Sequence, residues 1–247
     1  MRLAGRRDGP HLGHALAATA VMAAACGARA QTGWPELPDP PRSTVEWVAR
    51  DLVVDGLPSR IEHFDSELSA DEVLTYYRAR WARSARGEAR AVSAGGWRGL
   101  STLDGRFQLV VQVRDKTPHG SEGMLSVANL SAFRKSPLPA NWPRWSDVKT
   151  TQVTESSDGP KRSLLVAMVS TQGLDLNVRR WRDEWIRRGY GLAHEIAPQG
   201  EAGVRSWVGS FDKSLQTVDV AVAYREKDRR TYISVNLIGP VGTGMAP

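Results

Sequence analysis

Residues 69–81 read SADEVLTYYRARW, and this stretch decides the fold class. Ser69 and Glu72 have the spacing of a capping box, in which the Ser hydroxyl accepts from an amide of the first turn and the Glu carboxylate accepts from the cap amide. The larger apolar residues that follow recur at helical spacing, which indicates a helix with one face on a core. They are Val73, Leu74, Tyr77 and Trp81.

A second helix with the same pattern is predicted over residues 174–188. An offset of 104 residues aligns the two helices, so that Tyr77 corresponds to Trp181 and Trp81 to Trp185. Two related cores would need bulky residues at matching depths, and these pairs supply them.

Strand-like segments flank the helices in the same order. Before the first helix, residues 45–54 meet the turn signal Asp55-Gly56, and before the second helix, residues 148–154 are followed by Asp158-Gly159. About three strands follow each helix, with a hairpin signal at Asp104-Gly105 in the first half. Alternation of apolar and polar residues along them favours sheets with one buried face.

The predicted fold class is α+β, with two tandem related ββαβββ modules, each one helix packed on an antiparallel sheet. Trp97 and Trp207 are matched between the modules, and each is expected to pack under a hairpin. Chance similarity between two α+β segments is the alternative. The predicted segments are a signal peptide (1–30), a Pro-rich linker (31–43), module 1 (44–131), a joint (132–146), module 2 (147–239) and a tail (240–247).

The first 30 residues have the three parts of an export signal. Arg2, Arg6 and Arg7 make a basic start, an Ala-rich apolar stretch covers residues 15–25, and Ala28-Arg29-Ala30 fits a cleavage site before Gln31. We therefore expect a periplasmic or outer-membrane-associated protein. A poorly ordered cytosolic leader is the alternative.

Cys26 ends the apolar stretch, as in the lipobox of bacterial lipoproteins. Those signals usually carry Leu three residues earlier, where this chain has Ala23. Lipidation of Cys26 and simple cleavage both stay open. Membrane attachment is expected only through such an anchor, because no apolar run approaches the ~20 residues of a spanning helix.

The charge balance is mild once the leader is removed. The chain has 33 Lys plus Arg and 27 Asp plus Glu, of which four Arg and one Asp lie in residues 1–30, so 29 minus 26 leaves about +3. Nucleic-acid binding needs a concentrated basic surface, so no nucleic-acid partner is expected. A single Cys also excludes an internal disulfide framework and a Cys-based zinc site.

No catalytic motif is present. After the leader three His occur, His63, His119 and His194, and none is part of a spaced metal motif, although ligands can converge in space. The acidic residues from Asp65 to Glu72 lie where a helix start favours carboxylates, so helix capping is the favoured interpretation. We expect no metal, no cofactor and no assigned catalytic residue.

Candidate binding residues are aromatic or basic. Trp142 and Trp145 in the joint bury between the modules or form a stacking surface for a sugar or an extended peptide. Arg179 and Arg182 on the second helix face solvent or bind an anionic partner.

The leading functional hypothesis is an exported non-enzymatic binding or assembly module of the bacterial cell envelope that contacts a protein or a glycan. The alternative is a periplasmic hydrolase whose site is assembled only in three dimensions. A purely structural lipoprotein is a third reading.

Overall fold

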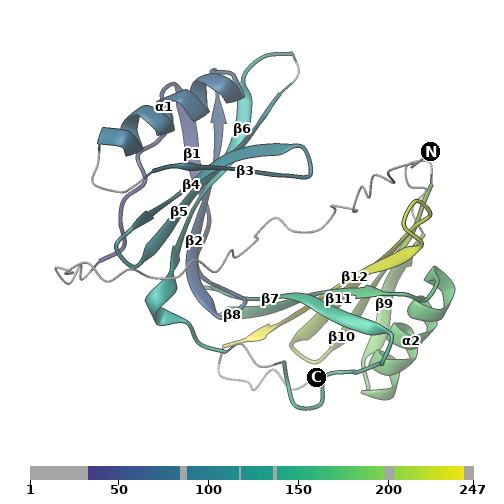
Figure 1. Ribbon diagram of the computed structural model, residues 1–247. Helices are drawn as coiled ribbons and strands as arrows, with labels where there is room; N and C mark the ends of the chain where they lie inside the picture. Colours follow the sequence, from purple (N-terminus) through teal and green to yellow (C-terminus); the bar gives the residue numbers. More distant parts are fainter. Residues whose placement is uncertain (1–32, 84–87, 117, 136–137, 198–202, 242–247) are drawn as a thin grey trace, which may run out of the picture. The chain divides into compact units, whose positions relative to one another are not determined.

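The computed structural model describes residues 33–83, 88–116, 118–135, 138–197 and 203–241. The chain divides into two compact units: unit 1 comprises Met1–Arg50 and Arg60–Ser131, and unit 2 comprises Asp51–Ser59 and Ala132–Pro247. Over its described residues, each unit is a sheet with one α-helix on one face (Figure 1).

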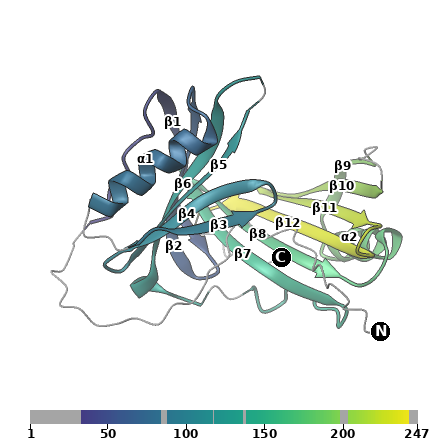
Figure 2. The ribbon, with the colours of Figure 1, turned by 45° about the horizontal axis from the view of Figure 1, so that its top comes forward.

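Unit 1 has the strand order β3-β4-β5-β6-β2-β1. α1 runs across one face of this sheet (Figure 2). The pairs β3–β4, β4–β5 and β5–β6 are antiparallel. The elements are β1 (Ser43–Val54), β2 (Leu57–Ser66), α1 (Ala70–Arg83), β3 (Arg90–Ala94), β4 (Trp97–Asp104), β5 (Phe107–Asp115) and β6 (Ser121–Asn129), followed by a 3-10 turn at Leu130–Ala132.

Unit 2 has the same element order, and its strands lie in the order β7-β8-β12-β11-β10-β9, antiparallel at every pair. The end of the hairpin formed by β1 and β2 also belongs to unit 2, where Leu52, Val53 and Val54 pair with β7. The elements are β7 (Val148–Asp158), β8 (Lys161–Ser170), α2 (Leu174–Arg187), β9 (Gly191–Ile196), β10 (Val204–Lys213), β11 (Gln216–Arg225) and β12 (Arg230–Pro240).

The expected α+β class is confirmed: the described residues are rich in antiparallel sheet and hold two α-helices. The expected strand number is too low, because among the described residues four strands follow each helix instead of three. In unit 1 the hairpin turn after Asp104 separates β4 from β5.

The start of α1 confirms the predicted capping box. The amide of Ser69 donates to Glu72 Oε2 over 2.9 Å, and the amide of Glu72 donates to Ser69 Oγ over 3.4 Å. The bonds from Ser69 lower the pKa of Glu72. The amide of Ala70 donates to Asp115 Oδ1 over 2.8 Å, which attaches the helix start to β5. The predicted apolar stripe is buried: Val73, Leu74, Tyr77 and Trp81.

α2 starts differently, and its predicted stripe of Val178, Trp181 and Trp185 packs on the core of unit 2 with Val178 partly buried. Gly173 at its start forms no side-chain cap bond, and buried Asn177 instead donates from Nδ2 to Gly173 O over 2.9 Å. Trp181 and Trp185 are fully buried. Gly189, with φ +82°, adopts the left-handed conformation that follows many helix ends.

Trp97 and Trp207 lie on different faces of their sheets. Trp207 belongs to the helix-covered core of unit 2. Trp97 is three residues before Leu100, which is in the core of unit 1, so strand alternation directs the Trp97 ring away from α1. When the β4–β5 and β10–β11 hairpins are aligned at their turns, Arg98 takes the position of Trp207. The predicted match of the two Trp is therefore wrong by one residue.

Part of the expected Pro-rich linker packs on unit 1. Trp34 and Leu37 lie against its core, and the Trp34 ring centroid is 5.4 Å from that of Phe107. The Tyr77 hydroxyl donates to Pro38 O over 2.6 Å. The described part of residues 31–43 is thus attached to the unit and is not a free tether.

Candidate functional site

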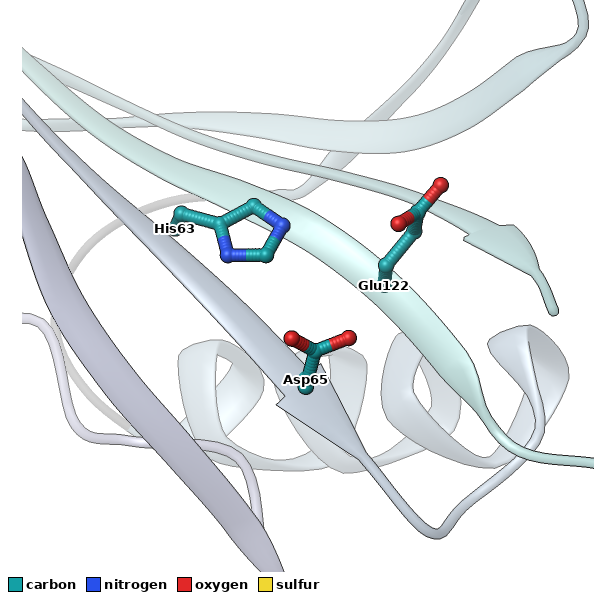
Figure 3. Close-up of side chains that lie close together, drawn as sticks. All are labelled: His63, Asp65 and Glu122. Carbon is teal, nitrogen blue, oxygen red and sulfur yellow. The ribbon is translucent and has the colours of Figure 1, made fainter.

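Three side chains that can ligate a metal ion converge on the sheet of unit 1: His63, Asp65 and Glu122. One ligand atom of each lies within 4.8 Å of the others (Figure 3). His63 and Asp65 are two residues apart on β2 and therefore share a face, and Glu122 is on the neighbouring strand β6. Phe64 between them points into the core under α1, so the three-residue cluster lies on the opposite face.

A close contact between β2 and β6 positions this cluster. The Phe64 ring occupies the space beside Gly123, where a Cβ would be 2.2 Å from Phe64 Cζ. Phe64 is flanked by His63 and Asp65, and Gly123 follows Glu122 directly. Because strand side chains alternate between faces, the buried contact sets the placement of the three ligands on the other face.

Each carboxylate of the cluster has a basic partner. Lys116 Nζ lies 2.6 Å from Asp65 Oδ1, and Arg114 Nε lies 2.6 Å from Glu122 Oε1. The hydrogen bond from Lys116 lowers the pKa of Asp65, and the same bond raises the pKa of Lys116. The Asp65 carboxylate is therefore held in the ionised form that a cation requires.

His63 faces acidic groups on two sides. Its Nδ1 lies 3.8 Å from Glu46 Oε1 on β1. Its other ring nitrogen, Nε2, lies on the side of Glu122 (Figure 3). The side chains of His63 and Glu122 are 29% and 23% exposed, so the cluster is partly shielded from water and still accessible. An imidazole and two carboxylates in this arrangement can bind a cation or exchange protons.

The two candidate Trp of the joint are parts of the unit 2 core. Trp142 is 3% exposed, and its ring centroid lies 6.1 Å from that of Trp181 and 6.3 Å from that of Trp185. Trp145 is partly buried and meets Trp181 edge-on at 4.9 Å. The Trp142 ring is therefore not available as a stacking surface.

The two candidate Arg of α2 do not join these Trp in one site. Arg179 is exposed. Arg182 pairs with Glu195 on β9, and its guanidinium lies 5.7 Å from the Trp207 ring. The cation beside Trp145 is Arg180, whose guanidinium lies 5.8 Å from the ring.

Of the remaining candidates, Cys26 lies outside the described residues. His119 and His194 are exposed and belong to a loop and to β9. Asp65 is not a capping residue of α1 as expected, because it lies on β2 and bonds Lys116.

The sequence interpretation missed the cluster because Glu122 is 57 residues from Asp65. A local signal was present, since His63 and Asp65 alternate with a core Phe on one strand. Identifying the third ligand requires knowing that β6 neighbours β2, which no spacing rule predicts.

The chain matches no protein-family model, and no curated protein or solved structure shows significant similarity to it. Within the described residues, neither α-helix has the length and apolar character needed to cross a bilayer.

Proposed function

We propose that this chain is an exported, non-enzymatic binding or assembly module of the bacterial cell envelope, and that its partner is a protein. The export part of the proposal rests on the basic, apolar and small-residue segments of residues 1–30. On this proposal the protein resides in the periplasm or at the outer membrane, and a lipid on Cys26 would attach it to the membrane.

We also propose that units 1 and 2 are copies of one module. Each has the element order ββαββββ. Across each sheet, the four strands that follow the helix lie in sequence order, and next come the second and then the first of the two strands that precede the helix. α1 and α2 have 14 residues each and start 104 residues apart. Tyr77 and Trp181 therefore hold the same helix position, and both are fully buried.

The observation that carries the binding function is strand β9. It ends the strand order of unit 2 and pairs with β10 on one side. All six of its residues are exposed. An edge strand with free backbone groups is the surface to which an extended peptide adds as a further strand.

A protein partner fits this surface better than a glycan. The exposed apolar side chains of β9 are Leu192 (38% exposed) and Ile196 (46% exposed), which suit alternating side chains of an added strand. A glycan would need an exposed aromatic platform. Of the two candidates for that role, Trp142 is buried, and Trp145 is partly buried against Trp181.

The test is site-specific photo-crosslinking in cells that express the full chain. A photoreactive residue replaces Ala193 on β9, or Leu215 in the β10–β11 turn as a control that is 78% exposed. We expect a discrete protein adduct from position 193 and none from position 215.

Other outcomes would overturn the proposal in different ways. Equal adducts from both positions would indicate non-specific contact. Cosedimentation with peptidoglycan without a protein adduct would favour the glycan partner. Turnover of a hydrolase substrate that depends on His63 would favour the hydrolase alternative, and retention in the cytosol would end the envelope assignment.

A further inference from the structure

We propose that His63, Asp65 and Glu122 bind one divalent transition-metal ion, with Zn²⁺ as the best match. The site lies on unit 1, whereas the proposed partner surface is β9 of unit 2. The two proposals can therefore fail independently.

The separation of the ligand atoms suits a single ion. In a tetrahedral zinc site, ligand atoms about 2.1 Å from the metal lie about 3.4 Å from one another. The three ligand atoms here lie within 4.8 Å. The largest separation exceeds this spacing by about 1.4 Å, which side-chain rotation has to close on binding.

The ligand types select the kind of metal. Ca²⁺ and Mg²⁺ prefer ligand sets made of oxygen, whereas imidazole nitrogen favours Zn²⁺ and its neighbours among the transition metals. Three protein ligands leave a fourth position for water or for a ligand from another molecule, which is the open form of a zinc site.

Basic and acidic side chains surround the three ligands. Lys116 bonds Oδ1 of Asp65 and Arg114 bonds Oε1 of Glu122, so each basic group engages one oxygen of its carboxylate. Glu46 Oε1 lies 3.8 Å from Nδ1 of His63, which is longer than a hydrogen bond. Nε2, on the Glu122 side, is the ring nitrogen placed to ligate an ion.

The charges around the cluster make a prediction about affinity. Lys116 repels a bound cation, so its removal strengthens binding although it deletes an ion pair.

The test is calorimetric titration of the full chain, purified without an affinity tag, with ZnCl₂. We expect one ion per chain that is lost or bound at least tenfold more weakly in His63→Ala and Glu122→Gln. Lys116→Gln should bind several-fold more tightly. Asp158→Asn, an exposed carboxylate at the end of β7, is the matched control and should leave the affinity unchanged.

Co²⁺ substitution gives a readout that does not depend on heat. The d–d absorption of bound Co²⁺ should have the high intensity of a four-coordinate site, and it should disappear in His63→Ala. The proposal is wrong if Zn²⁺ does not bind, or if it binds equally well to His63→Ala whose circular dichroism matches that of the unsubstituted chain. Weaker binding in Lys116→Gln would also contradict it.

Discussion

The Phe64 ring lies so close to the Gly123 backbone that a Cβ at position 123 would be 2.2 Å from it. Gly123→Ala should therefore force the ring or the strand to move and lower the free energy of unfolding by about 1–3 kcal/mol. Urea denaturation measures this change. Gly191→Ala on β9 is the control, because a Cβ there would have its nearest neighbour at 3.9 Å. Equal stability of Gly123→Ala and Gly191→Ala would show that the contact is looser than described.

The capping box of α1 should contribute measurably to stability. Ser69→Ala removes the oxygen that accepts from the Glu72 amide, and the loss of such a cap costs about 1 kcal/mol. Thermal unfolding should show a lower midpoint for Ser69→Ala. Ser157→Ala, at an exposed position of β7, should unfold at the original temperature. The cap would be unimportant if both variants behaved alike.

Trp142 should behave as a core residue. Trp142→Ala opens a cavity beside Trp181 and Trp185 and should cost about 3–5 kcal/mol. Trp47, which is 43% exposed, provides the matched control, and Trp47→Ala should have a much smaller effect. A stable Trp142→Ala variant that loses only ligand binding would restore the stacking role predicted for this residue.

Asp228 should make part of the stability dependent on pH. Its side chain is 7% exposed, and the hydrogen bond from Arg225, with one from Tyr232, lowers its pKa to about 2. An Asp with a depressed pKa in the folded state stabilises the fold above its ordinary pKa of about 3.9, and this contribution is lost as the pH falls through about 2.

The variant that tests this contribution is Asp228→Asn, which keeps the shape of the side chain. It should be less stable than the original chain at neutral pH, and the difference should shrink between about pH 5 and pH 2. Urea denaturation at several pH values gives the two curves. Curves that stay parallel over this range would rule out a role for the Asp228 charge.

The helices and the fold class could be predicted because their signals are local. The Ser69–Glu72 spacing and the apolar stripes depend only on helical geometry. The face of the sheet on which each strand residue lies was harder to predict, since a shift of one residue moves every side chain of a strand to the other face. That is why the match of Trp97 with Trp207 failed: the hairpin turns set the register, and the Trp spacing does not.

The candidate site could not be predicted for a topological reason. β2 and β6 are neighbours in the sheet although α1 and three strands separate them in the chain. For Trp142 the sequence left burial and a stacking surface both open. The structure buries its ring against Trp181 and Trp185, a contact between the joint and α2 that local spacing does not reveal.

The hairpin end at residues 51–59 has a consequence for any attempt to express the halves separately. Asp55 exchanges two bonds with Val153: its amide donates to Val153 O, and its Oδ1 accepts from the Val153 amide, both over 2.8 Å. A fragment that starts at Ala132 would lack Asp55, and the backbone groups of β7 that bond residues 51–59 would have no partner. Division of the chain after Ser131 should therefore not give two halves that fold separately, and the fragment that starts at Ala132 should aggregate.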